Sequence, residues 1–217
     1  MKKINSEVIN NFFLLLNENN INYILIKNID NELPNNLIDG KDIDILVHLD
    51  SKEEFENIMK ENNYNILTHP QGNENGWNFG YNMPSCQFWK KNDNSFTLYI
   101  DVNFILCCKS LINKTWVPLN EPINNSIWQN KIFDKNNNWW IMDDKNLLLY
   151  LIVRCIFDKS NFSDSYIKEI EIRKHYINEI KDKLEITFFK FNSHLQQLIK
   201  DSNYNKIIND YITYNKY

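Results

Sequence analysis

The sequence of 217 residues predicts an α+β fold, in which a sheet-forming half is followed by a helical part. Short runs rich in β-branched and aromatic residues are spread over residues 21–104, and one of them alternates between polar and apolar positions. From Asp143 onward, apolar residues recur at helical spacing instead. The length suits one compact domain or one and a half. We therefore expect an α/β domain over residues 1–142 and a helical subdomain over residues 143–217.

The first predicted elements are a helix over residues 6–16 and a buried strand over residues 22–27. We expect Ser6 to cap the helix, whose apolar residues recur every three or four positions. The polar stretch that follows the strand contains Pro34 and cannot hold regular structure for long. Residues 42–47 read Asp-Ile-Asp-Ile-Leu-Val, and this alternation predicts a second strand.

A second helix is predicted over residues 52–62, because Ser51 can cap it and two glutamates lie in its first turn. A third strand is expected at residues 64–67. Residues 86–90 and 96–104 predict two further strands, joined by a hairpin turn of Asn, Asp and Ser residues.

Residues 111–140 contain two prolines and many asparagines, so we expect an irregular crossover with short strands there. Beyond it, Asp143 or Asp144 can cap a helix that contains the apolar run 147–157. Further helices are expected over residues 164–184, over residues 186–200 and near residue 217.

Glycine is scarce, and this excludes two classes of nucleotide site. The chain has four glycines, Gly40, Gly72, Gly76 and Gly80. A dinucleotide fingerprint needs three close glycines at a strand-to-helix turn, and a P-loop needs two followed by Lys and Ser or Thr. None of the four meets either spacing. Any phosphate-binding site in this chain must therefore use groups other than a glycine-rich loop.

Charge and apolar run lengths limit the partners. The net charge of −4 provides no basic field for duplex nucleic acid. The longest apolar runs are far shorter than the roughly 20 residues of a membrane span. The four cysteines, Cys86, Cys107, Cys108 and Cys155, form no C-x-x-C pair, and no secretion signal is visible. We therefore expect a cytoplasmic protein with no membrane partner, whose adjacent Cys107 and Cys108 are buried.

Three acidic residues are the strongest candidates for chemistry. Asp42 and Asp44 lie two positions apart on a predicted strand, so their side chains share one face. Two such carboxylates repel each other unless a cation lies between them, and oxygen-rich sites suit Mg²⁺ or Mn²⁺. Asp101 lies inside a later apolar strand. If the two strands are neighbours, the three acids converge on one or two metal ions that can activate a hydroxyl and neutralise a triphosphate.

These motifs resemble a known family. The strand at residues 24–27, the segment Gly40–Val47 with its Asp-x-Asp pair, and the strand at residues 98–102 resemble the nucleotidyltransferase fold of the polymerase-β superfamily. The closer resemblance is to uncharacterised bacterial nucleotidyltransferase-like proteins with the same Asp-Ile-Asp-Ile-Leu-Val strand, and it covers residues 21–104. It implies a short mixed sheet flanked by helices, two divalent metals, and transfer of a nucleoside monophosphate from an NTP to an acceptor.

The resemblance also implies residue roles. Asp42 and Asp44 would bind both metals, and Asp101 would bind the catalytic metal and help to deprotonate the acceptor. Where the family usually has a Gly-Gly or Gly-Ser pair after the first strand, this chain reads Lys27-Asn28-Ile29. Lys27 can offer a point charge to phosphate, and Asn28 adopts positive φ more readily than most residues other than glycine. Lys41 is a further nucleotide contact, or a counter-ion of the aspartates.

Three more residues are weaker candidates. His48 follows the Asp-x-Asp strand and could face the site. Arg154 lies within the apolar run of a predicted helix, so it either pairs with an acid or reaches a ligand. Trp77, in a loop between glycines, either stacks on a base or fills the core.

The expected function is therefore a metal-dependent nucleotidyltransferase that acts on a small molecule, with a sugar as one option, or on a protein. The alternative is a binding or scaffold module of the same fold without turnover. A metal site also predicts that Asp44→Asn is neutral or stabilising without metal, because it removes a like-charge repulsion.

Overall fold

The structure is a computed structural model that describes residues 2–67, 78–79, 86–93, 95–109 and 115–214. Its centre is a seven-stranded sheet with the order β3-β5-β6-β2-β1-β10-β9. The pairs β2–β6 and β1–β10 are parallel and the other neighbours are antiparallel, so the sheet is mixed. The predicted α+β fold, a mixed sheet flanked by helices and followed by a helical part, is confirmed.

The strands of this sheet are β1 (Tyr23–Leu25), β2 (Asp42–Val47), β3 (Asn65–Leu67), β5 (Gln87–Asp93), β6 (Phe96–Asn103), β9 (Ile132–Asp134) and β10 (Trp139–Ile141). The helices are α1 (Ser6–Glu18), α2 (Lys52–Glu61), α4 (Glu121–Gln129), α5 (Asp144–Val153), α6 (Asp164–Arg173), α7 (Lys181–Phe188), α8 (Asn192–Lys200) and α9 (Tyr204–Tyr214).

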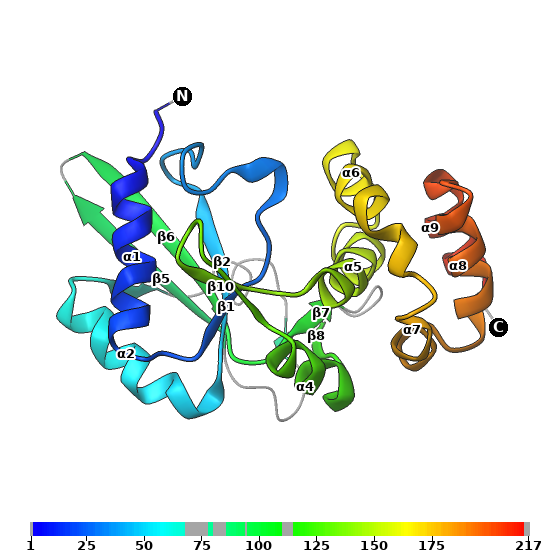
Figure 1. Ribbon diagram of the computed structural model, residues 1–217, viewed down its shortest axis with the longest axis horizontal. Coiled ribbons are helices and arrows are strands. Elements are labelled where there is room, and N and C mark those ends of the chain that lie inside the picture. Colours follow the sequence, from blue (N-terminus) through cyan, green and yellow to red (C-terminus); the bar gives the residue numbers. More distant parts are fainter. Residues whose placement is uncertain (1, 68–77, 80–85, 94, 110–114, 215–217) are drawn as a thin grey trace.

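One face of the sheet is covered by α1 and α2 (Figure 1). Strand β2 presents Ile43, Ile45 and Val47 to this face, and each is at most 2% exposed. Burial of one such side chain stabilises the fold by roughly 1.5–3 kcal/mol. A shift of β2 by one residue would expose all three, so their burial fixes the register and turns Asp42 and Asp44 to the opposite face.

The opposite face is covered by α4 and by the helical part. Figure 1 shows α5 beside the sheet and α6–α9 beyond it, with the C-terminus at the far end of the molecule. The side chains of Ile24, Ile26 and Leu46 lie on this side of the sheet. They pack in a core that contains residues of α4 and of α5–α9. This core has members on both sides of residue 142, the predicted boundary between the two domains. The boundary itself stays a prediction.

A second, three-stranded sheet is formed by short strands that alternate in sequence with the strands of the large sheet. Its order is β4-β8-β7, formed by β4 (Asn78–Phe79), β7 (Cys107–Lys109) and β8 (Thr115–Pro118). Strand β7 lies against a π-helical turn, Arg154–Asp158, that directly continues α5. This contact brings a strand and a helix end together at the carboxyl end of β6.

Of two predicted helix caps, one is wrong and one is right in position only. Helix α1 begins at Ser6, but its cap is Asn5, whose side-chain oxygen accepts a hydrogen bond from the Glu7 backbone N–H (3.0 Å). Ser51 occupies the N-cap position of α2 as predicted, but its side chain makes no capping bond, and its hydroxyl accepts from the Asn22 backbone N–H (3.2 Å). The local pattern therefore located both helices without predicting the hydrogen bonds at their first turns.

The irregular crossover predicted for residues 111–140 was partly wrong. It contains the predicted short strands, but also α4, a two-and-a-half-turn helix with Pro122 in its first turn. The single helix predicted over residues 164–184 is two, α6 and α7, separated by a 3₁₀ turn at Lys174–Tyr176, and α8 begins only at Asn192. Over the part of the chain that is described, no helix is long and apolar enough to cross a bilayer.

Candidate functional site

The three predicted acids come together where β2 and β6 run side by side. These strands are parallel and in register, with Asp44 opposite Asp101. One carboxylate oxygen from each of Asp42, Asp44 and Asp101 lies within 4.8 Å of the other two. An all-oxygen group with three negative charges suits a hard divalent cation such as Mg²⁺ or Mn²⁺. The side chains present therefore fit the expected metal.

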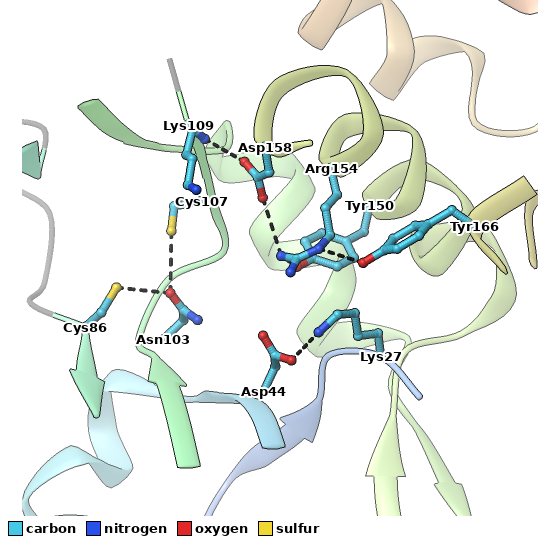
Figure 2. A network of polar contacts seen from close by, with 10 residues as sticks. All are labelled: Lys27, Asp44, Cys86, Asn103, Cys107, Lys109, Tyr150, Arg154, Asp158 and Tyr166. Carbon is cyan, nitrogen blue, oxygen red and sulfur yellow. Dashed lines mark hydrogen bonds and ion pairs between the residues drawn. The ribbon is translucent and has the colours of Figure 1, made fainter. Parts of the chain in front are cut away.

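Lys27 brings a cation to this group. It follows β1, the strand beside β2, and its ammonium pairs with the Asp44 carboxylate (Figure 2). Both side chains are largely buried, at 14% and 17% exposure. Burial by itself would raise the pKa of Asp44, but Lys27 and Arg154 outweigh it, so this pKa lies below its usual range. Asp42 behaves in the opposite way, because burial and then Asp44 and Asp101 raise its pKa.

The acids form one wall of a cavity of about 350 Å³. Ionic and polar groups dominate its lining. The lining residues are Ile26, Lys27, Glu32, Lys41, Asp42, Asp44, Cys86, Asp101, Asn103, Leu106, Cys107, Lys109, Trp116, Tyr150, Arg154, Asp158, Lys159 and Tyr166. A space of this size lined by charges suits a small ionic ligand better than an apolar one.

The wall opposite the acids is built around Arg154. Its guanidinium donates to the hydroxyls of Tyr166 (Nε, 2.9 Å) and Tyr150 (Nη1, 3.0 Å). It also pairs with Asp158 one turn later (3.4 Å). Figure 2 shows Arg154 and Asp158 reaching from the helical part toward Asp44 and Lys27 on the sheet. The sequence predicts that Arg154 either pairs with an acid or reaches a ligand. In the structure it pairs with Asp158, and its side chain lines the cavity.

Asp158 joins this wall to the small sheet. Its carboxylate accepts a hydrogen bond from the Lys109 backbone N–H (2.8 Å). The Lys109 ammonium lies over the Trp116 ring, 5.2 Å from its centre. Burial is the main cause that raises the pKa of Asp158, against the pull of Lys109 and Arg154. Lys159, the next residue, also lines the cavity. We call Lys109, Arg154, Asp158 and Lys159 the cationic wall.

The structure does not place Asn28 as the sequence predicts. Its side-chain amide donates to the Leu33 carbonyl (3.1 Å) and accepts from the Leu33 N–H (2.9 Å), which closes the loop after β1. Its φ is −137°, so it does not use the left-handed conformation that asparagine tolerates; Asp30 and Asn31 adopt that conformation, at 56° and 51°. Among the described residues that line the cavity of the acids, Asn28 is absent.

Lys41 and His48 also have other partners. The Lys41 ammonium lines the cavity but pairs with Glu32, and not with Asp42 or Asp44 as a counter-ion would. His48 accepts a hydrogen bond from the Asp50 N–H (3.3 Å) and lies edge-on to Trp128. Among the described lining residues His48 is absent, so the structure gives it no place in the site. Trp77 lies outside the described residues.

Two thiols border the site. Cys86 and Cys107 both contact the side-chain oxygen of Asn103, at 3.0 and 3.5 Å. The contact with Cys86, and then burial, raises the pKa of Cys107 well above its usual value. Cys107 and Cys108 are buried as predicted, each 5% exposed. All four cysteines are free.

Most of the cationic wall is not predicted by any pattern in the sequence. Lys109 and Lys159 carried no motif, and their positions depend on how β7 meets the end of α5. One signal was available, because Tyr150, Arg154 and Asp158 recur every four residues in an otherwise apolar run. Three polar side chains at that spacing share one helix face, which is typical of a helix that turns this face toward a polar cavity.

Comparisons with known proteins give the following. A scan against protein-family models finds no match, and a search of the curated proteins finds none. The chain is similar in structure to the lincosamide antibiotic adenylyltransferase LnuA in its lincomycin-bound crystal structure, with TM-score 0.46, 13% identity, and coverage of 80% of this chain and 98% of that one. It is also similar to the antibiotic-resistance factor ANT(2'')-Ia in solution, with TM-score 0.46, 10% identity, and coverage of 91% and 96%.

The likeness concerns the course of the backbone. Any function must come from the side chains of the cavity.

Proposed function

We propose that this chain is a metal-dependent nucleotidyltransferase, which transfers a nucleoside monophosphate from an NTP to a small-molecule acceptor, with a sugar as one class, or to a protein. The observation that carries the proposal is the convergence of three carboxylates on neighbouring parallel strands, at the wall of a charged cavity. Three acids within 4.8 Å of one another are costly unless positive charge joins them, and such a cost is typical of a site that binds cations.

In this proposal Asp42, Asp44 and Asp101 hold one or two ions of Mg²⁺ or Mn²⁺. The bound cation would neutralise phosphate charge and make an acceptor hydroxyl more acidic. Asp101 accepts the proton of that hydroxyl. The hydroxyl oxygen then forms a bond to the α-phosphorus while the bond to pyrophosphate breaks, so pyrophosphate leaves with the electron pair. Lys27 positions the Asp44 carboxylate through their ion pair.

A cytoplasmic location suits this reaction. NTPs are cytoplasmic substrates, and four free cysteines are typical of a reducing compartment. The proposal therefore keeps the location expected from the sequence.

The test uses each of the four NTPs with Mg²⁺ or Mn²⁺, and follows thermal stability and pyrophosphate release. We expect a metal–NTP pair to raise the melting temperature, and Asp42→Asn and Asp101→Asn to abolish pyrophosphate release. Asp50→Asn is the matched control, because this acid is 90% exposed and lies outside the cavity. Equal release by the wild type and both site variants would overturn the proposal.

The second candidate is a binding module of the same fold without turnover. The ion pair between Lys27 and Asp44 favours it, because the ammonium already occupies one carboxylate of the site. In that case a metal–NTP pair raises the melting temperature, yet no pyrophosphate appears with any of a panel of sugars and other hydroxyl-bearing acceptors. Pyrophosphate release that requires Asp101 excludes the module.

A further inference from the structure

The end of β1 is poorly suited to hold a polyphosphate. Lys27 pairs with Asp44, and the Asn28 amide closes its own loop through Leu33. Neither side chain is directed at a ligand. The glycines that would let a backbone approach phosphate closely are missing from this position. If the cavity takes a polyphosphate, its anionic oxygens need positive charge from elsewhere.

The cavity separates charge between its two sides. Among the described lining residues on the sheet side, four carboxylates (Asp42, Asp44, Asp101, Glu32) and two lysines (Lys27, Lys41) give a net charge of −2 at neutral pH. On the other side, the cationic wall has three cations and one carboxylate, which gives +2. A complex of a divalent cation with a polyphosphate matches both sides at once, with its metal toward the acids and its phosphates toward the cationic wall.

Lys159 is the member of the wall best placed to meet such a ligand. It lines the cavity, its side chain is exposed at the rim, and among the described residues it forms no ion pair. Partial desolvation of its ammonium against the cavity, and then its neighbours Arg154, Lys27 and Lys109, lower its pKa. Positive charges that crowd around one space repel each other, and a bound anion relieves that repulsion.

We infer that the polyphosphate of the donor is held by the side chains of Lys109, Arg154 and Lys159, on the wall opposite the acids, in place of a backbone cradle at the end of β1. This inference rests on the proposed function for its donor, a nucleoside triphosphate. It gives the helical part a direct share in substrate binding. Tyr150 and Tyr166 fix the Arg154 guanidinium for this role, and the exposed Lys159 supplies a further contact.

The probe is sodium tripolyphosphate with an equal concentration of MgCl₂, titrated by calorimetry into the full chain. We expect Lys159→Met to weaken tripolyphosphate binding by about tenfold, since one charge-assisted contact is lost. Lys168→Met is the matched control, because Lys168 is exposed on α6 and does not line the cavity, and it should bind as the wild type does. Circular dichroism checks that both variants are folded.

The outcomes separate this inference from the proposed function. Equal affinity in wild type and Lys159→Met overturns the inference, as does a wild type that binds no tripolyphosphate at millimolar concentration. Pyrophosphate release that persists in either case leaves the proposed function standing. Lys159-dependent binding without pyrophosphate release from any NTP supports the polyphosphate site and removes the transferase. Arg154→Lys is a second variant, which keeps the charge but loses the fork, and it should weaken binding less than Lys159→Met.

Discussion

Asp42 and Asp44 have the same chemistry and lie two residues apart on one strand, yet their surroundings drive their pKa values in opposite directions. Asp44 has Lys27 on its carboxylate and Arg154 nearby, and both favour the charged form. Asp42 has burial and two neighbouring carboxylates against it. A shared face of a strand therefore does not mean a shared charge state.

The metal-free stability of two variants tests this difference. Asp44→Asn should lose about 1–3 kcal/mol in urea unfolding at pH 7 with a chelator, because it strands the buried Lys27 ammonium. Asp42→Asn should cause no loss, because it removes a disfavoured charge. The sequence alone predicted a neutral or stabilising Asp44→Asn, so the structure reverses the expected sign. The double variant Lys27→Met with Asp44→Asn should recover part of the lost stability. An Asp44→Asn variant as stable as the wild type would contradict a stabilising ion pair between Lys27 and Asp44.

A carboxylate in the helical part gives a prediction about acid. Glu171 accepts hydrogen bonds from Ser202 (2.6 Å) and Tyr204 (2.7 Å) and pairs with Lys174 (2.6 Å). Partial burial opposes the charged form, but these partners outweigh it and lower the pKa of Glu171 from 4.5 to about 2.

The folded-state pKa of Glu171 is thus below its unfolded value. Its contribution to stability is present above about pH 4.5 and is lost as the pH falls toward about 2. Melting temperatures from pH 6 to pH 2 should show wild type above Glu171→Gln at pH 6, with the gap closing as the pH falls. A gap that is constant with pH would show that this carboxylate is not the source.

The sequence predicted the centre of the site and missed its surroundings, for a physical reason. Asp42 and Asp44 share a face because a strand has a period of two, which is a local property. The partner of Lys27 depends on which strand lies beside β1, and the cationic wall depends on where β7 meets the end of α5. Such contacts join residues far apart in the chain, and no spacing encodes them.

At the scale of elements, α4 is the clearest departure from the predicted structure. Its sequence is rich in asparagine, and Asn has low helix propensity because its side chain competes for backbone hydrogen bonds. One of these asparagines nevertheless stabilises the fold. The buried Asn124 accepts from the Leu106 N–H (2.9 Å) and donates to the Leu119 carbonyl (2.8 Å). Tertiary contacts therefore supply what local propensity lacks.

Asn124→Ala should accordingly destabilise the protein by about 2–4 kcal/mol, because two buried backbone groups lose their partners together. Asn125→Ala changes the same residue type at the exposed neighbouring position and should cost less than about 0.5 kcal/mol. Urea unfolding of both variants measures the difference. Similar losses in the two would mean that helix propensity, and not the bonds of Asn124, accounts for the effect.

At the scale of the molecule, the sheet and the helical part share one core. The face of the sheet that carries Ile24, Ile26 and Leu46 packs with residues of α4 and of the C-terminal helices. The sequence predicted a sheet-forming part followed by a helical part, because the change from strands to helices near residue 142 was visible as a change in the spacing of apolar residues. The sequence did not predict that the two halves share a buried core, because the spacing of apolar residues describes one helix or strand at a time.

This shared core predicts that the chain unfolds as one unit. All six tryptophans lie before residue 141, so their fluorescence reports on the first half, while circular dichroism at 222 nm has a large contribution from α5–α9. The two urea transitions should coincide. A fragment of residues 1–142 should remain unfolded, since it exposes its side of the core. A fluorescence transition separate from the loss of helix would instead support two independent domains.

The ion pair between Lys27 and Asp44 also matters while the chain folds, before any ligand binds. A nascent chain that closes its sheet brings three negative charges together, and Lys27 arrives with β1 as part of the same sheet. The chain thus carries its own counter-ion from synthesis onward. Under the proposed function, a cell short of magnesium or manganese would still hold a folded reserve of this protein. Its activity would then follow the supply of the ion within the time of binding, without the delay of new synthesis.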